Sequence, residues 1–374
     1  MPSPLAEPPA APRLDHLDGL RGIAALYVVW FHAGVCFLKT PLPAWARAAS
    51  RLLAFGHEAV AIFIVLSGYC LMLPAARAGD GRLAHGVRGY FARRAWRILP
   101  PYYAALLGSL AVIALVPALR GQAPTGTIWD DTHPALAAGP VLSHLLLVHN
   151  FFPAWVFRIN GPLWSVATEW QIYFFLPFLL LPLWRRRGPL VTVAAAFALG
   201  YLPLVVAPAV AYAVVPWYLG LFALGMVAAG IGWAPRPPAR RLRQVIPWGR
   251  LALLLVAICV VGGLVLAKLW FRWKPVTDVL VGLTTAALLV HCDTGGRVAR
   301  LLSSPPLVGL GHFSYSLYLT HLPVVAGCYF VVRSLPLGPV AHVAVLLALS
   351  TAAALLVAYG FHRLVERRFM PKRR

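Results

Sequence analysis

Long apolar runs dominate this sequence and constrain what it can fold into. Ten stretches of about 17–25 residues are long enough to cross a bilayer whose hydrocarbon core is about 30 Å thick. They lie near residues 22–38, 58–76, 99–119, 163–184, 188–208, 210–232, 251–271, 276–292, 306–331 and 339–361. The sequence therefore predicts an all-α protein, a polytopic transmembrane helix bundle with about ten spans.

Composition supports a membrane protein and argues against a nucleic-acid-binding one. The chain is 60% apolar and 12% charged, whereas a soluble domain has about 45–50% apolar and about 25% charged residues. Its net charge of +22 is concentrated between the apolar runs, which is typical of loops that face anionic lipid. We therefore predict a multi-pass protein of the cell (inner) membrane, with the lipid bilayer as a partner and no nucleic acid.

The distribution of basic residues predicts the orientation. With the N-terminus inside, 24 of the 33 Lys and Arg residues lie in inner segments and the other nine lie outside. Basic loops stay on the cytoplasmic side of a membrane, so both termini are expected in the cytoplasm. The apolar piece 139–152 is too short to span comfortably, and a crossing there would invert every later loop. We expect it to form a short re-entrant or interfacial helix on the outer side.

No composition shift divides the chain, so residues 1–374 are predicted to form a single transmembrane domain with no appended soluble domain. The five cysteines each stand alone in or beside an apolar run. This pattern is typical of small apolar packing residues. The sequence therefore predicts neither a metal site nor a bound cofactor.

Charged groups inside a span cost about 2.5–3.5 kcal/mol each, so they need a reason. In LDGLRGIAALYVVWFHA, Arg21 and His32 are eleven residues apart. They would share one face of a helix, about 16 Å apart along its axis. A long donor with phosphates at one end and a reactive centre at the other would suit this spacing. The alternative is a snorkelling arginine and a hydrogen-bonded core histidine.

Two further segments carry charge beside predicted spans. In RGYFARRAWRILPPYY, Arg94 and Arg97 are three residues apart and can share a helix face. Guanidinium groups bind phosphate through paired hydrogen bonds, although an ordinary basic loop is the alternative. In FGHEAVAIFIVLSGY, Glu58 begins the second span beside His57.

Two later segments place polar groups on helical stripes. In NGPLWSVATEWQIYFFLP, Ser165, Glu169 and Tyr173 are spaced by four residues and fall on one face. Glu169 is the only acidic residue of that run, and it is either a functional group or a partner for another helix. In LGHFSYSLYLTHLPV, Tyr318 and His321 share a stripe. That stripe lines a polar cavity or bonds helix to helix.

Taken together and in order, these segments resemble the acyltransferase-3 family of membrane acyltransferases. The resemblance runs from Leu17 to Glu366 and rests on LDGLRGIAAL with R-x10-H, FIVLSGY, RRAWRILPPYY, GPLWSVATEW and FSYSLYLTH. It implies a ten-helix transmembrane domain that uses cytoplasmic acyl-CoA as co-substrate. One position departs from the family pattern. Many members carry an Asp where this chain has Ala61, and Glu58, one helical turn earlier, is the candidate replacement.

The resemblance also implies roles for individual residues. It implies that His32 is the essential histidine, that Arg21 is its partner, and that Arg94 and Arg97 meet the donor phosphates. We expect Arg21, Arg94 and Arg97 together to anchor the donor phosphates at the cytoplasmic mouth. Glu169 is implied to be the functional acidic residue.

The sequence therefore predicts an O-acyltransferase that moves an acyl group from acyl-CoA to a hydroxyl. By resemblance, the group is acetyl and the acceptor contains carbohydrate. His32 is expected to act as general base, or as a transient acyl carrier, with Glu58 or Glu169 fixing its tautomer. The candidate acceptor cavity comprises Trp164, Ser165, Tyr173, Tyr318 and His321. The alternative is a proton-coupled transporter or flippase of a glycan or lipid, with His32 and both glutamates as a proton relay.

Overall fold

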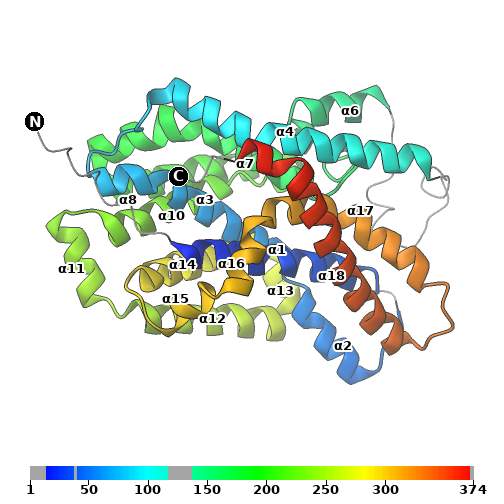
Figure 1. Cartoon of the computed structure of the whole chain (residues 1–374). Coiled ribbons are helices and arrows are strands. Elements are labelled where there is room, and N and C mark those ends of the chain that lie inside the picture. The colour runs from blue at the N-terminus through cyan, green and yellow to red at the C-terminus, as the bar shows by residue number, and fades with distance from the viewer. Residues whose placement is uncertain (1–13, 38–39, 117–136, 371–374) are drawn as a thin grey trace, which may run out of the picture.

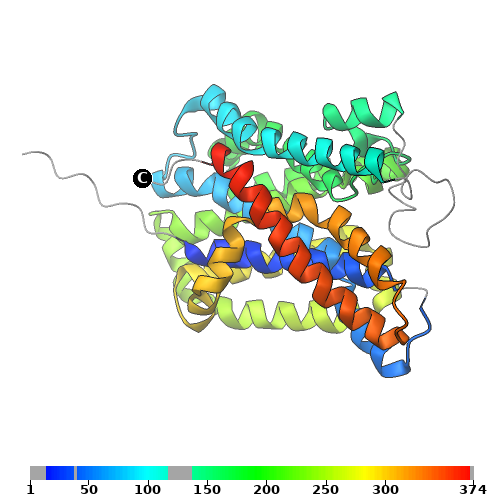
Figure 2. The same cartoon turned by 45° about the vertical axis from the view of Figure 1, so that its right-hand side comes forward.

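The computed structural model describes residues 14–37, 40–116 and 137–370, and every regular element in these ranges is a helix. The longer helices run side by side as a bundle (Figure 1), and Figure 2 shows the same arrangement after a turn of 45°. Seven helical stretches are long and apolar enough to cross a membrane, or eight if one bent pair counts as a span. The predicted all-α polytopic bundle is confirmed.

The helices have the following bounds. They are α1 (Asp15–Val35), α2 (Ala44–Ser50), α3 (Gly56–Ala78), α4 (Gly86–Leu115), α6 (Ala138–Leu145), α7 (Leu163–Phe175), α8 (Leu181–Val206), α9 (Pro208–Val214), α10 (Tyr218–Trp233), α11 (Pro237–Val245), α12 (Trp248–Val265), α13 (Ala267–Arg272), α14 (Lys274–Asp293), α15 (Arg297–Leu302), α16 (Pro305–His312), α17 (Ser314–Val332) and α18 (Pro339–Leu364). Short 3₁₀ turns lie at Arg51–Leu53, His149–Phe151 and Glu366–Phe369, and a π turn at Leu176–Leu180 joins α7 to α8.

The expected number of spans, about ten, differs from seven or eight for two reasons. Helix α1 carries Asp15, Asp18 and Arg21 and is not among the stretches that are counted as long and apolar enough to cross. The stretch Leu163–Val206 counts once although it has 44 residues, about 66 Å if straight. It breaks at Gly188, where φ is 82°, and division there gives two crossings of ordinary length.

Several predicted boundaries shift. The predicted span 306–331 is divided into α16 and α17, and the predicted span 251–271 into α12 and α13. The predicted spans 22–38 and 99–119 end in residues outside the described ranges. Residues 139–152 form the eight-residue helix α6 and one 3₁₀ turn. Helix α6 is about 12 Å long and cannot cross a bilayer, which agrees with the prediction that this piece is not a span.

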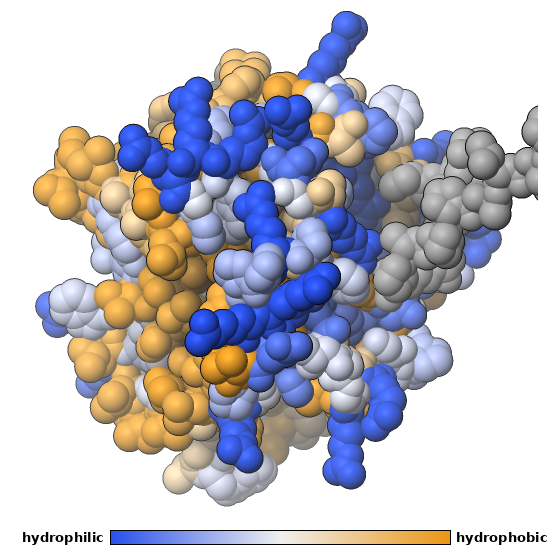
Figure 3. Space-filling model, turned by 90° about the vertical axis from the view of Figure 1, so that its left-hand side faces the viewer, coloured by the Kyte–Doolittle hydropathy of each residue, from blue (hydrophilic) through white to orange (hydrophobic). Residues whose placement is uncertain are grey.

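The basic segments meet at one end of the bundle. Arg236 donates a hydrogen bond of 2.7 Å to the carbonyl of Gly79, which joins the ends of α10 and α3. His16 Nε2 lies 3.7 Å from a carboxylate oxygen of Asp293, which joins the start of α1 to the end of α14. The turn after α18 packs against α4. Hydrophilic side chains cover much of this end, which faces the viewer in Figure 3. The first and last described segments therefore lie at the same end.

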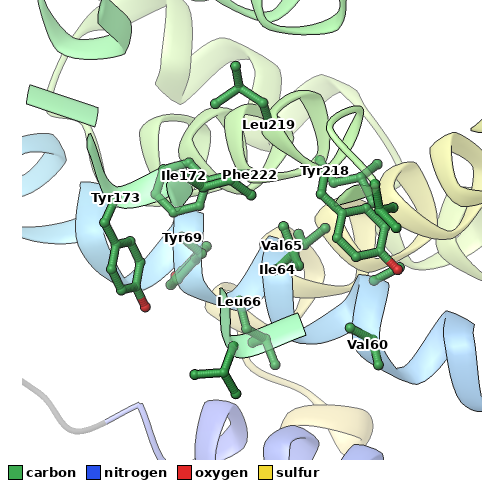
Figure 4. Packing of buried hydrophobic residues seen from close by; sticks show 14 of the residues in the cluster. Val60, Ile64, Val65, Leu66, Tyr69, Ile172, Tyr173, Tyr218, Leu219 and Phe222 are labelled. Atoms are coloured by element: carbon green, nitrogen blue, oxygen red, sulfur yellow. The ribbon is translucent and has the colours of Figure 1, made fainter. Parts of the chain in front are cut away.

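Helices α3 and α10 cross with their backbones close together. A Cβ atom added to Gly68 would lie 2.0 Å from the carbonyl oxygen of Phe222, and one added to Gly225 would lie 2.0 Å from that of Val65. Small residues allow this close backbone approach, which is how helices associate in lipid. Figure 4 shows side chains of α3, among them Tyr69, packed with side chains of α10 and α7. This crossing fixes α3, which carries one wall of the site described next.

Candidate active site

Two cavities lie next to each other in the bundle, separated by side chains that line both, Val60 and Tyr318. The first, here called the arginine cavity, has a volume of about 180 Å³ and is lined by polar and charged groups including Arg21, Ser67, Cys70, Arg94, Arg97, Ser165, Glu169, Tyr173 and Ser314. The second, here called the histidine cavity, has a volume of about 320 Å³ and is lined by Phe31, His32, His57, Phe157, Gly161, Trp164, Tyr212, Trp217 and Lys274, among others.

Arg21 enters the arginine cavity from the first turns of α1. Its guanidinium donates to an Asp18 carboxylate oxygen at 3.1 Å and to the Cys70 sulfur at 2.9 Å. The first contact is within α1 and the second reaches α3. These bonds hold the guanidinium beside the cavity near the basic end of the bundle.

Arg94 and Arg97 enter from α4 and differ in their partners. A guanidinium nitrogen of Arg97 lies 3.6 Å from Glu366, which also accepts hydrogen bonds from Ser316 at 2.6 Å and from His362 at 2.9 Å. Arg94 has no hydrogen-bond or ion-pair partner among the residues that the structure describes. Its half-buried guanidinium is therefore available for an anion.

Glu169 lines the arginine cavity and does not reach His32. The Tyr173 hydroxyl donates to a Glu169 carboxylate oxygen at 2.6 Å, and Ser67 lies 3.2 Å from the same hydroxyl. The expected one-turn spacing of Glu169 and Tyr173 is therefore real. The expected contact between Glu169 and the His32 imidazole is absent, because His32 faces the other cavity.

His32 lines the histidine cavity with one imidazole nitrogen left open. His321 Nδ1 lies 2.8 Å from the Tyr318 carbonyl, which can only accept, so His321 Nε2 is unprotonated in the neutral ring. His32 Nδ1 lies 2.9 Å from the Val28 carbonyl and 3.1 Å from His321 Nε2, so it is the donor to both. These assigned tautomers leave a lone pair on His32 Nε2. The partner of His32 is thus a histidine, in place of the expected carboxylate.

Glu58 is also turned away from His32. Its carboxylate accepts a hydrogen bond of 2.8 Å from the indole of Trp270. It lines a separate, largely apolar cavity of about 390 Å³ between α1, α3, α12 and α14. The idea that Glu58 fixes the His32 tautomer is therefore wrong in this structure. The reason is the side of α3 on which each side chain lies. Glu58 lies on the face that meets α13, whereas its neighbour His57 faces the histidine cavity.

Tyr318 forms much of the wall between the cavities. Its hydroxyl lies 2.6 Å from the Ser165 hydroxyl and 3.2 Å from the Pro162 carbonyl. The five residues expected in one acceptor cavity are therefore distributed. Ser165 and Tyr173 line the arginine cavity, Trp164 lines the histidine cavity, Tyr318 lines both, and His321 is fully buried behind His32.

Sequence reasoning missed a second histidine centre. His57 Nε2 lies 2.9 Å from an Asp278 carboxylate oxygen, which also accepts a hydrogen bond of 2.8 Å from Trp217. Asp278 is fully buried. The available signal was its position inside the predicted span 276–292, because a carboxylate within a span indicates function by default. Across the described ranges, no cluster of three His, Cys, Asp or Glu residues could hold a metal ion.

Comparison with known families decides what kind of protein carries these cavities. Residues 14–359 match the model of an acyltransferase domain. The chain belongs to the acyltransferase 3 family. Members are membrane acyltransferases, so the chain is an acyltransferase that requires an acyl donor. Buried titratable groups are also compatible with a proton-coupled transporter or flippase. Family membership favours the enzyme over that alternative.

Individual members of the acyltransferase 3 family show the extent of the likeness. The acyltransferase MdmB of Streptomyces mycarofaciens is 28% identical over 344 residues, which are 85% of this chain and 80% of that protein. A protein of Staphylococcus aureus predicted to be an O-acetyltransferase is 26% identical over 337 residues, 83% of this chain and 50% of its own length. No solved structure matches the chain.

Proposed function

We propose that this acyltransferase moves an acetyl group from acetyl-CoA to a hydroxyl of a carbohydrate-containing acceptor. In this proposal the basic end of the bundle faces the cytoplasm of the cell membrane, because basic loops are retained there. The arginine cavity then takes the donor from the cytoplasm. The histidine cavity takes the acceptor.

The observation that carries the proposal is the unpaired Arg94 beside Arg21 and Arg97. A cationic group that is half-buried without a partner is costly unless a ligand supplies the anion. Phosphates of acyl-CoA are such anions, and a guanidinium can bind them through two parallel hydrogen bonds. Arg21 and His32 are eleven residues apart on α1, about 16 Å along the axis. The thioester of a donor anchored at the arginines can therefore extend toward Tyr318 and His32.

In this proposal His32 acts as the general base. Its Nε2 removes the proton of the acceptor hydroxyl as the oxygen attacks the thioester carbonyl. The tetrahedral intermediate collapses, the carbon–sulfur bond breaks, and the proton passes from the imidazolium to the CoA thiolate. The products are the ester and free CoA. His321 accepts the Nδ1 proton in a hydrogen bond throughout, which keeps Nε2 directed at the cavity.

The acyl-histidine route uses the same atoms in two steps. Nε2 attacks the thioester carbonyl and expels the thiolate. The acceptor hydroxyl then attacks the acyl-histidine, its proton passes to the thiolate, and the neutral imidazole is regenerated. Rapid-quench mass spectrometry of the full chain with acetyl-CoA and no acceptor separates the routes. A covalent acetyl group on the peptide that contains His32 would replace the general-base role by the carrier role.

The proposal is tested by comparing cells with and without the protein. Mass spectrometry of cell-surface glycans, lipids and small secreted glycosides should show a product heavier by one acetyl group only where the protein is present. The mass difference and its fragment identify the acyl group and the acceptor together. Cells that carry His32→Gln at equal membrane levels are the control. The proposal fails if the wild-type protein changes none of these molecules while purified protein consumes no acetyl-CoA.

A further inference from the structure

A buried carboxylate holds His57 at the side of the histidine cavity. Asp278 is fully buried, and one of its oxygens accepts hydrogen bonds from His57 at 2.9 Å and from Trp217 at 2.8 Å. Its second oxygen is sealed from solvent without a partner. A carboxylate in an apolar bundle is costly to bury. In the neutral ring this carboxylate fixes one tautomer of His57, with the proton on Nε2, which also lies 3.2 Å from the Tyr218 hydroxyl, and a lone pair on Nδ1.

The histidine cavity therefore presents two unprotonated imidazole nitrogens. His32 Nε2 enters from α1 and His57 Nδ1 from α3, and neither atom is sealed from solvent or bonded within the described ranges. Trp164 stacks on the His57 ring, with centroids 5.9 Å apart and planes at 12°, which fixes the direction of its edge. Both nitrogens can only accept hydrogen bonds, so a matching ligand must offer two donors.

We propose, on the basis of the proposed function, that His57 binds a second hydroxyl of the acceptor while the reacting hydroxyl faces His32. The enzyme would thereby select acceptors that carry two hydroxyls close enough to reach both nitrogens. Asp278 acts through His57 and is a positioning residue. A site built to hydrogen-bond a hydroxyl discriminates against an analogue that lacks it, because the polar group of the protein is then left without its partner.

The test pairs acceptor analogues with enzyme variants. Full-length protein in lipid nanodiscs is assayed with acetyl-CoA and methyl β-D-glucopyranoside, and then with each monodeoxy analogue. With the wild type, one deoxy analogue that still becomes acetylated should show an acceptor KM about tenfold higher, equivalent to about 1.4 kcal/mol. With His57→Phe, which keeps the ring against Trp164 but cannot accept a hydrogen bond, that tenfold difference should disappear. The donor KM should stay within about twofold.

Asp278→Asn should raise the acceptor KM and leave the donor KM unchanged. Asp293→Asn is the matched control, because Asp293 lies on the same helix, is hydrogen-bonded to Tyr69 at 2.6 Å and lines neither cavity. It should keep wild-type kinetics. If loss of that hydroxyl raises the acceptor KM by the same factor in the wild type and in His57→Phe, the inference is overturned. A fall in the kcat of His57→Phe with an unchanged acceptor KM also overturns the inference, because His57 would then be the proton acceptor.

Binding without turnover separates this inference from the proposed function. Saturation-transfer NMR with the same glycosides reports acceptor binding in the absence of acetyl-CoA. Loss of the signal of the parent glycoside in His57→Phe, but not in Asp293→Asn, supports the inference even if no ester forms. Failure of every glycoside to bind wild-type protein overturns the inference. Donor binding and consumption of acetyl-CoA then still test the proposed function.

Discussion

The two cavities differ in the kind of charge they present. Three guanidinium groups and one carboxylate line the arginine cavity, whereas two histidines and one lysine line the histidine cavity, without a carboxylate among its described lining residues. Binding of a polyanion needs permanent charge, and acceptance of a proton needs a neutral nitrogen. This chain thus places its guanidinium groups and its cavity-lining histidines in separate volumes that share one wall. Donor recognition and proton transfer should therefore be separable by mutation.

The sidedness of the two cavities has an all-or-none test. Arg186 lies at the basic end of the bundle and Ser334 lies between α17 and α18 at the opposite end; both side chains are exposed. In intact cells, a membrane-impermeant maleimide should label Ser334→Cys and leave Arg186→Cys unlabelled until the membrane is opened. The parent protein corrects for its own five cysteines. Labelling of both sites in intact cells would break the assignment of opposite sides.

Loss of the open nitrogen in the histidine cavity should have the largest kinetic effect. His32→Gln keeps a polar side chain but cannot take up a proton, so kcat should fall by at least about 10²-fold. Acetyl-CoA binding, measured by calorimetry on the same protein, should be unchanged because the arginines are intact. Turnover close to that of the wild type would make His32 a structural residue.

Arg94 and Arg97 should not contribute equally to donor binding. Arg94→Ala removes an unpaired guanidinium, whose charge-assisted contact of about 1.5–3 kcal/mol corresponds to a rise in donor KM of about 10- to 100-fold. Arg97→Ala should have a smaller effect, because Arg97 already interacts with Glu366. Arg88→Ala, an exposed arginine of the same helix outside the cavity, is the control. If all three substitutions raise the donor KM equally, the arginines contribute only general surface charge and the arginine cavity is not the donor site.

Substitution of His321, which is buried behind the His32 imidazole, should have the smallest effect. His321→Leu removes one of the two acceptors for His32 Nδ1, and the loss of one neutral hydrogen bond predicts a fall in kcat on the order of tenfold. His321→Gln can supply an amide oxygen at a similar place and should restore most of the activity. If Leu and Gln give the same kcat and the same melting temperature, His321 has no positioning role.

The sequence was informative wherever one helix carries the whole pattern. The position of Arg21 and His32 on one helix, the approach of Arg94 and Arg97 to one cavity, and the bond between Tyr173 and Glu169 all follow from helix periodicity. Relations between helices did not follow, because the rotation of each helix about its axis is set by packing. That rotation turns Glu58 toward α13 and brings Asp278 to His57. The His32–His321 contact joins residues 289 positions apart, and no spacing rule reaches so far.

The shared wall of Val60 and Tyr318 has a consequence beyond catalysis. The arginine cavity contacts the first turns of α1 through Arg21 and the histidine cavity contacts its last turns through Phe31 and His32. If water fills both cavities, only Val60 and Tyr318 separate the two volumes of water. The membrane voltage should then fall mostly across these two side chains, so the electric field there is stronger than elsewhere in the bundle. Smaller side chains at these two positions would turn an enzyme into a leak for protons and small ions. The bulk of Tyr318 would thereby limit ion leakage as well as separate the two cavities.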